Sequence, residues 1–526
     1  MPTPHPNSLS ASAIWNDLKT LPQPTLEQLF SGIGDGGEGA DEPSGDERVA
    51  MLSQRLELGG EAGGVLFDWS KTHLTRAVIA RFEVLAEAMG LDDLRDRLFA
   101  GEIVNPTEGR AADHATLRGV GDPAKVEEAA ALIDRMAILV EAIQGGAFGE
   151  IEHLIHIGIG GSALGPALGF DALSRDLKRC DVHVVSNIDG AALEEAFAAC
   201  DPAKTMIAVA SKTFTTIETM TNAGSALTWL EQGGVSDPYG RVVALTANPE
   251  AAVEWGVDET RVLPFQESVG GRYSIWSSIG FPIALGVGMD DFRAMLAGAA
   301  AMDKHFRDAP AGENAVLRAA FADLYYTRVR GCQTRAVFAY DERLRLFPDY
   351  LQQLEMESNG KRVTADMAPV DGPTAPITWG GVGTDAQHAV FQLLHQGTHL
   401  VPVDFIVSIA PADELDPAHH RILLMNCFAQ GAALMAGKAG EDPARNYPGD
   451  RPSATILCDD IDAETLGALI AFHEHRTFAN AVLMGINPFD QFGVELGKQM
   501  ANAIEGGGGE FDASTRSLLG AAGLRG

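Results

Sequence analysis

Positively charged residues are scarce in this sequence: 39 lysines and arginines face 72 aspartates and glutamates, which gives a formal net charge of -33. Such a charge repels nucleic acid and anionic membrane surfaces from most of the molecule, so we expect neither as a partner. An anionic small molecule would have to be held by a few locally gathered cations together with backbone N–H groups. The basic residues in turns rich in glycine, serine and threonine are therefore the ones to follow.

The sequence also has few cysteines and no long apolar run. The five cysteines are scattered and form no Cys-x-x-Cys pair, which argues against a disulfide framework and a zinc ribbon. No apolar run approaches the roughly 18 residues of a membrane span, and residues 1–18 lack the basic start and apolar centre of a secretory signal. We therefore expect a cytoplasmic globular protein, and its 526 residues predict two or three domains.

The sequence does contain a regular alternation of two kinds of segment. Short runs rich in β-branched residues are expected as strands at 153–159, 182–186, 205–210, 242–246 and 261–265, and the segments 163–177, 191–200, 216–232 and 249–255 as helices. This order predicts a parallel sheet with helices on both faces and a ligand at the carboxyl ends of the strands. The alternation returns later, with strands expected at 335–340, 376–379, 401–409 and 454–458 and helices at 386–396, 421–438 and 464–482.

The turn after the first of these strands, GIGGSALGP at 158–166, is rich in glycine. It satisfies the pattern G-x-G-x-x-A, which makes a nicotinamide-dependent dehydrogenase a legitimate alternative. That interpretation requires an acidic residue at the end of the second strand to bind the ribose, and Asp189 comes only in the following turn. Ser162 has another use, because it offers a hydroxyl and an N–H group to a sugar or phosphate oxygen.

The turn after the third strand carries more polar groups. Residues 210–216, ASKTFTT, place four hydroxyls and one ammonium at the start of a helix. Helix-start N–H groups, short hydroxyls and a cation together favour a phosphate monoester, and the helix dipole adds to the attraction. N-capping would explain one serine or threonine, but not four of them together with Lys212.

The second half of the chain contains a carboxylate whose position on a helix can be predicted. The segment 349–361, DYLQQLEMESNGK, is typical of a helix end, because its Asn-Gly pair favours termination. Gln353 and Glu357 lie four residues apart and therefore project from one face of the helix. This spacing makes Glu357 a candidate general base.

Basic side chains stand out at two further places. In VGGRYS, 269–274, two glycines allow a close approach of the backbone, and Arg272 supplies a permanent cation suited to oxyanions. Near the C-terminus, residues 489–498, FDQFGVELGK, place Gln491 and Lys498 on one side of a helix.

Histidines occur at three notable positions. His388 follows a glycine at the opening of an expected helix, while 395–399, HQGTH, and 473–475, HEH, each hold two histidines. Two histidines four apart on a helix can ligate zinc. However, Gln396 stands where a zinc protease has glutamate and Gly397 weakens the helix, so we favour structural roles for both pairs.

Six blocks of sequence resemble, in order and spacing, the motifs of the glucose-6-phosphate isomerase family. They are GIGGSALGP (158–166), SKTFTTIET (211–219), VGGRYSIWSSIG (269–280), QQLEMESNGK (352–361), GTDAQHAVFQLLHQGTH (383–399) and FDQFGVELGKQ (489–499). The segment TEGRAADHATLR (107–118) resembles the N-terminal region of the same family. Several long blocks in one order are far more specific than a single glycine pattern. The sequence departs from the family at Asp385-Ala386, where Asn-Gly is usual, at Asp113, where an apolar residue is common, and at the acidic, glycine-rich segment 31–46, which we expect to be a surface loop or a disordered insertion.

The resemblance implies an α/β fold of two doubly wound, mainly parallel-sheet sugar-isomerase-type domains, each with three αβα layers. The smaller domain would cover 120–288, and the larger one would join 1–119 to 289–526, with extra helices at both termini. It also implies a homodimer that interconverts glucose 6-phosphate and fructose 6-phosphate through a cis-enediolate, without a metal or a redox cofactor.

Carried over position by position, the resemblance implies a role for each candidate residue. Glu357 would move a proton between C2 and C1, Arg272 would stabilise the enediolate, and His388, with help from Lys498, would open the sugar ring in the partner's site. The phosphate would be held by Ser211, Lys212, Thr213 and Thr216, and the sugar would be lined by Gly161, Ser162, Gln353 and Gln491. Two alternatives stay open: a phosphosugar sensor that binds without turnover, and the dehydrogenase, which leaves the 211–216 turn unexplained.

Overall fold

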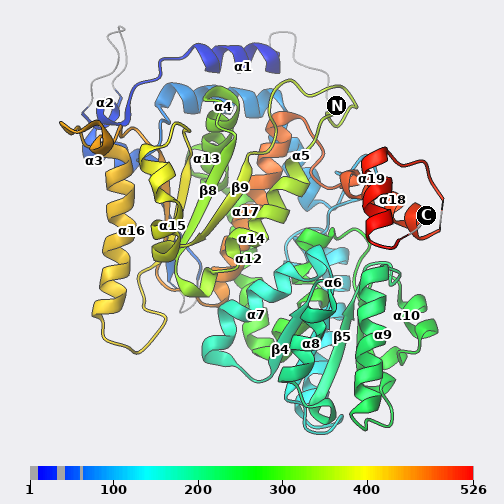
Figure 1. Cartoon of the computed structure of the whole chain (residues 1–526). Helices are drawn as coiled ribbons and strands as arrows, with labels where there is room; N and C mark the ends of the chain where they lie inside the picture. The colour runs from blue at the N-terminus through cyan, green and yellow to red at the C-terminus, as the bar shows by residue number, and fades with distance from the viewer. Residues whose placement is uncertain (1–9, 32–41, 60–62, 507, 525–526) are drawn as a thin grey trace. The chain divides into compact units, whose positions relative to one another are not determined.

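The structure, a computed structural model, describes residues 10–31, 42–59, 63–506 and 508–524. The chain forms two compact units, Met1–Pro488 and Phe489–Gly526, which Figure 1 traces in colour. Within the described ranges, no helix is both long enough and apolar enough to cross a membrane. Of the segment 31–46, expected as a surface loop, residues 32–41 lie outside the described part.

The first sheet is built from the alternation that begins at residue 153. Its strands are β3 (His153–Ile157), β4 (Asp181–Val185), β5 (Thr205–Ala210), β6 (Val242–Thr246) and β7 (Val262–Pro264). They pair in the order β4-β3-β5-β6-β7 and every pair is parallel, which confirms the predicted sheet. Its helices are α6 (Pro123–Gln144), α7 (Leu164–Leu177), α8 (Gly190–Ala199), α9 (Ile217–Gln232), α10 (Pro249–Trp255) and α11 (Phe281–Gly286).

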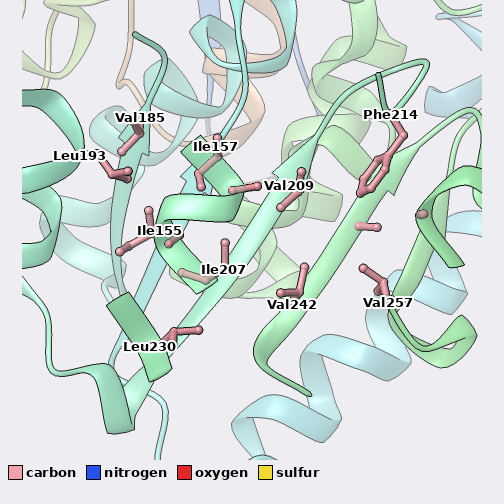
Figure 2. Close-up of a cluster of buried hydrophobic side chains, with 14 of the residues drawn as sticks. Ile155, Ile157, Val185, Leu193, Ile207, Val209, Phe214, Leu230, Val242 and Val257 are labelled. Carbon is pink, nitrogen blue, oxygen red and sulfur yellow. The ribbon is translucent and has the colours of Figure 1, made fainter. Parts of the chain in front are cut away.

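Apolar side chains hold α8, α9 and α10 on one face of this sheet. Ile155, Val209 and Val242 of the strands are buried in one cluster with Leu193 of α8 and Leu230 of α9, as Figure 2 shows. Each fully buried aliphatic side chain contributes about 1.5–3 kcal/mol. On the other face, α11 packs against β3 and β4 and against α6 and α7. The sheet is therefore a firmly packed base for the turns at its edges.

The strand order reverses between β3 and β5. From β3 the chain moves outward to β4, returns to the other side of β3 as β5, and continues to β6 and β7. In doubly wound sheets, ligands bind at the carboxyl ends of the strands that flank such a reversal. The two turns singled out in the sequence, 158–162 and 211–216, follow directly from these two strands.

The second sheet is mixed. Its strands are β1 (Ser53–Glu57), β2 (Gly64–Asp68), β8 (Thr334–Tyr340), β9 (Ile377–Val382), β10 (Val403–Ser408) and β11 (Ser453–Cys458). The order β11-β10-β8-β9 is parallel as predicted, whereas β1 and β2 form an antiparallel hairpin that pairs with β11. The sequence pattern does not predict this hairpin, because Gln54, Arg55 and Glu57 give β1 a polar sequence.

Two long helices, α12 (Met289–Asp308) and α17 (Ala463–Met484), cross at glycines. A methyl group at Gly298 would lie 1.8 Å from the carbonyl oxygen of Glu464, and one at Gly467 would lie 1.9 Å from the carbonyl oxygen of Met295. The two backbones therefore touch at this crossing. Packing against α12, α13, α4 and α5 buries every residue of α17 except Glu464.

The remaining helices of the first unit are α1 (Ala11–Thr20), α2 (Leu26–Ser31), α3 (Gly45–Leu52), α4 (Arg76–Ala88), α5 (Leu91–Phe99), α13 (Ala315–Leu324), α14 (Phe347–Gln352), α15 (Gly383–Gln396) and α16 (Ala418–Ala436). The second unit holds α18 (Glu495–Glu505) and α19 (Ala513–Ala521). The division of the chain into a smaller domain at 120–288 and a larger remainder stays a prediction.

Candidate active site

The carboxylate singled out in the sequence lies on a π-helical turn. Helix α14 continues directly into a π-helix, Gln353–Glu357, and the helix ends at Asn359. The sequence pattern predicts an ordinary α-helix here, so the wider turn is a difference, and such turns occur frequently at functional sites. Across the turn, Nε2 of Gln353 donates a hydrogen bond of 2.9 Å to Oε2 of Glu357. The two side chains therefore lie on one face of the helix.

The same turn carries a second carboxylate that has a different environment. Glu355 is buried, forms ion pairs with Arg335 of β8 and Arg476 of α17, and accepts a hydrogen bond from Thr378 of β9. Burial alone would raise the pKa of Glu355, but the two guanidinium groups outweigh it and lower this pKa to about 2. Glu355 is therefore ionised near neutral pH and ties the turn to the second sheet, while Glu357 keeps 21% of its side chain exposed.

Arg272 approaches Glu357 from a distant part of the chain. It lies on a 3-10 helix, Gly271–Trp276, and is buried, with its Nη1 3.5 Å from Oε2 of Glu357. Its Nε donates to Oγ of Ser358 over 2.6 Å, and its Nη2 donates to the carbonyl of Pro488. These contacts fix the direction of a permanent cation beside Glu357. A cation placed in this way can stabilise a negatively charged oxygen that forms there.

The glycine-rich turn after β3 meets the Arg272 segment at the backbone. A methyl group at Gly161 would lie 2.1 Å from the carbonyl carbon of Gly271, and one at Gly160 would lie 3.1 Å from Nε2 of Gln353. The absence of side chains at these positions is therefore explained by the protein's own close packing. A dinucleotide is not needed to account for the G-x-G-x-x-A pattern.

The hydroxyl-rich turn after β5 has an unusual backbone. Phe214 is in the left-handed region, with φ of 57°, and its ring is buried in the core beside Val209 and Val257 (Figure 2). Around it, Oγ of Ser211 lies 3.1 Å from Oγ1 of Thr216. A non-glycine residue in this conformation costs about 1–3 kcal/mol and clusters at ligand sites, and left-handed residues in turns help to form anion-binding concavities.

Lys212 of this turn bridges to the Arg272 segment. Its Nζ donates to the carbonyl oxygens of Glu267, at 2.6 Å, and Val269, at 3.3 Å. Burial lowers the pKa of Lys212, and the charge of Arg110 lowers it further. An ammonium group has three donors, so two backbone contacts leave one for another acceptor.

The other predicted site residues lie elsewhere. Ser162 ends the short 3-10 helix after β3, His388 is exposed on α15, and Gln491 and Lys498 belong to the second compact unit, where Lys498 is exposed on α18. The structure thus brings Gly161, Gln353, Glu357 and Arg272 together and places Ser162 and the 211–216 turn at neighbouring strand ends. The roles of all these residues stay predictions.

Two residues that the sequence analysis missed support Arg272. Ser358 is buried and lies 3.0 Å from the hydroxyl of Tyr273, and the hydroxyl of Tyr350 donates to the carbonyl of Arg272 over 3.2 Å. The only signal in the sequence was that Ser358 follows Glu357 directly. The partner that makes it informative lies 86 positions away.

The paired histidines have structural surroundings. His475 is fully buried in α17, with Nε2 2.6 Å from Oδ1 of Asp303, and burial lowers its pKa. His395 lies 2.9 Å from the side-chain oxygen of Gln430. These contacts support the structural roles favoured for both pairs.

Known proteins resemble this chain over nearly its whole length. The family profile described as phosphoglucose isomerase matches residues 68–519. A protein named glucose-6-phosphate isomerase from Erythrobacter litoralis is 72% identical over 520 residues, covering 97% of this chain and 98% of its own. One of the same name from Novosphingobium aromaticivorans is 67% identical over 517 residues, covering 98% and 99%.

A solved structure gives the same result for the fold. The crystal structure of a glucose-6-phosphate isomerase from Chlamydia trachomatis superposes with a TM-score of 0.86 at 28% sequence identity. The match covers 98% of this chain and 99% of that one.

Proposed function

The chain belongs to the phosphoglucose isomerase family, and from this premise we propose that it is an isomerase that interconverts glucose 6-phosphate and fructose 6-phosphate. The observation that carries the proposal is the pair formed by Glu357 and Arg272, a partly exposed carboxylate held 3.5 Å from a buried cation. Aldose-ketose interconversion needs a base for the C–H proton and a positive charge for the oxygen that becomes negative. These two groups supply both.

In the proposed reaction, Glu357 takes the proton from C2 of the open-chain aldose and the C1 carbonyl oxygen becomes negative, which gives a cis-enediolate. The protonated Glu357 then returns the proton to C1, and the hydroxyl proton of O2 passes to O1, so that the C2 oxygen becomes the new carbonyl and the C1 oxygen a hydroxyl. The hydrogen bond from Gln353 supports this role because it fixes one carboxylate oxygen and thereby the direction of the other. Arg272 would stabilise the enediolate.

The phosphate would be held by the turn 211–216. Ser211, Thr213 and Thr216 offer hydroxyls, Lys212 offers an ammonium, and the turn leads into α9, whose N-terminus attracts an anion. Gly161, Ser162, Gln353 and Gln491 would line the sugar. A grip on the phosphate, remote from the reacting carbons, supplies binding energy that positions C1 and C2 beside the base.

We further propose a homodimer in which His388 reaches into the neighbouring subunit's site and opens the sugar ring there, with Lys498 assisting. His388 is exposed on α15, as a residue that acts in another subunit must be. Exposed apolar side chains lie on α15 and α16, namely Leu393, Ile422, Met425 and Phe428. Exposed apolar residues gathered on neighbouring elements are typical of an interface, and a second copy of the chain is the occupant that we propose.

We also propose that the protein is cytoplasmic. All five cysteines are free thiols, which suits a reducing compartment.

Proton NMR of fructose 6-phosphate in D2O, with purified protein and excess chelator, tests the reaction. We expect glucose 6-phosphate to appear with deuterium at C2, and Glu357→Gln to abolish this exchange while phosphosugar binding persists. If the ketose persists unchanged while its proton signals broaden on addition of the protein, the protein is a sensor and not an enzyme. Full activity of Glu357→Gln would remove Glu357 from the role of base.

A further inference from the structure

A group of metal-ligating side chains lies at the end of the first sheet opposite the proposed active site. Among the described residues, His153, His183 and Cys200 each offer one ligand atom, and these atoms all lie within 4.8 Å of one another. The two imidazole rings have centroids 6.0 Å apart. Neither histidine belongs to the segments that resemble the isomerase motifs, and the proposed reaction uses none of the three residues.

The fold explains why these residues meet. In the parallel ladder of β3 and β4, His153 pairs with Asp181 and Ile155 pairs with His183, so the two histidines are diagonal neighbours on one face of the sheet. That face is covered by α8, which starts at the carboxyl edge and runs back to the amino edge. Cys200 is the residue that ends α8. The thiol of Cys200 therefore lies at the same end of the strands as the two histidines.

One ring nitrogen of each of the two histidines is available as a metal ligand. Nδ1 of His153 and Nε2 of His183 are shielded from solvent, and neither has a hydrogen-bond partner among the residues that the structure describes. A shielded, unpaired nitrogen costs about 1–3 kcal/mol. Two such nitrogens beside one thiol constitute a penalty that a bound cation would remove.

The donor set suits a cation with nitrogen and sulfur ligands. Zn²⁺ is bound in proteins by imidazole nitrogen and by thiolate sulfur, and a coordinating metal ion removes the proton from a thiol. Asp181, paired with Lys178, is the nearest carboxylate of β4.

We propose that His153, His183 and Cys200 form a binding site for a thiophilic divalent cation of the Zn²⁺ class. Zinc–nitrogen bonds of about 2.0–2.1 Å and zinc–sulfur bonds of about 2.3 Å place tetrahedral ligand atoms roughly 3.3–3.6 Å apart. The three donor atoms, which lie within 4.8 Å of one another, would therefore move closer by up to about 1.5 Å when a cation binds. Three protein ligands leave a fourth position that a water molecule can occupy.

The site is separate from the proposed chemistry. His153 begins the five-residue strand β3, and the glycine-rich turn follows the strand's other end, roughly 16 Å away at 3.3 Å per residue. A cation here would join β3, β4 and the end of α8, and would therefore stabilise the first sheet. We expect no effect on isomerisation when the cation is removed.

Titration of the full-length, tag-free protein with Co²⁺, after treatment with a chelator, tests the proposal. We expect one equivalent to bind with the thiolate-to-cobalt charge-transfer absorption and the intense visible bands of a tetrahedral site, and Zn²⁺ to displace it. Cys200→Ser should abolish the charge-transfer band, and His183→Gln should weaken Zn²⁺ binding at least tenfold. Zn²⁺ should raise the thermal denaturation midpoint of the unsubstituted chain and not that of Cys200→Ser.

Matched controls separate this site from adventitious binding. Cys180→Ser removes a neighbouring buried thiol, and His419→Gln removes an exposed histidine of α16; both should keep the band and the affinity. Absence of stoichiometric binding, a cobalt spectrum without the thiolate band, or an equal loss in the controls would overturn the proposal. Each result is independent of activity, so it leaves the proposed isomerase function untouched.

Discussion

Gln353 donates a 2.9 Å hydrogen bond to Glu357 across a π-helical turn, and the bond holds one carboxylate oxygen in place while the other is left to act. The wider π-turn brings these two residues to the same face with Arg272 opposite. The direction of the carboxylate is therefore set by a neighbour on its own helix.

Replacement of Gln353 by methionine tests how much this hydrogen bond contributes to catalysis. The side chain keeps its length but loses the amide, so Glu357 is no longer aimed, and we expect kcat to fall about 10- to 100-fold with little change in KM. Steady-state kinetics in both directions measure it. Gln352→Met on the same helix is the control, and equal losses in the two variants would contradict the orienting role.

Arg272→Lys tests the geometry of the cation, since the charge is kept. Lysine lacks the fork that contacts both Ser358 and Pro488, so we expect kcat to fall about 10²- to 10³-fold. The thermal midpoint should be measured alongside, because those contacts also join distant segments. Arg293→Lys, on the exposed face of α12, should retain full activity, and an active Arg272→Lys enzyme would refute the assignment.

The hydroxyl-rich turn 211–216 should determine the affinity for the phosphate group of the substrate. Thr216→Val removes one hydroxyl at constant shape, and loss of one hydrogen bond to a charged group predicts a KM for fructose 6-phosphate about 10- to 100-fold higher. Inhibition by inorganic phosphate should weaken in parallel. Thr228→Val, at an exposed position further along α9, is the control; unchanged phosphate inhibition in Thr216→Val would move the phosphate site away from this turn.

Acid should destabilise the protein partly through Glu355. Although burial opposes it, the attraction of Arg335 and Arg476 lowers the pKa of Glu355 from 4.5 to about 2. Because the pKa is depressed in the folded state, this stabilisation is present above pH 4.5 and is lost as pH falls toward 2, by up to about 1.4 kcal/mol per pH unit. Urea unfolding at a series of pH values measures the slope.

Glu355→Gln should flatten that slope between pH 4.5 and 2. It should also destabilise the protein at pH 7, because two buried guanidinium groups lose a counter-ion, by about 3–5 kcal/mol. Glu342→Gln is the control, because it removes the carboxylate of a partly exposed ion pair on the surface. It should leave the slope as it is. An unaltered acid slope in Glu355→Gln would show that other carboxylates dominate.

The glycine crossing of α12 and α17 predicts a large stability effect. Gly298→Ala places a methyl group 1.8 Å from a backbone oxygen, so the helices must separate, at a cost of about 1–3 kcal/mol or more. Gly224→Ala, in the middle of α9 with open space around it, should instead stabilise the protein by about 0.4–1 kcal/mol. Thermal denaturation compares the two, and equal effects would contradict the close crossing.

The elements that the sequence predicted are those whose signal is local. The strands β3, β5 and β6 are marked by their β-branched residues, and the hydroxyls of 211–216 and the spacing of Gln353 and Glu357 are visible within a few positions. The parallel order and the position of the strand reversal then follow from alternation. Most of the first sheet and the candidate site were predictable for this reason.

The missed features depend on contacts between distant positions. Ser358 matters because Arg272, 86 positions earlier, bonds to it, and the polar strand β1 forms because β2 and β11 lie beside it. Glu355 of the π-turn likewise pairs with arginines of β8 and α17. Spacing within one segment carries no information on such contacts.

The placement of Glu355 and Glu357 on one turn has a consequence for enzyme engineering. Glu357 faces the candidate site, whereas Glu355, two positions earlier, forms buried ion pairs with two arginines. Libraries that randomise the whole turn to broaden substrate range would lose most variants to misfolding. Libraries that keep Glu355 constant would retain its pairs with Arg335 and Arg476 and so the anchor of the whole turn.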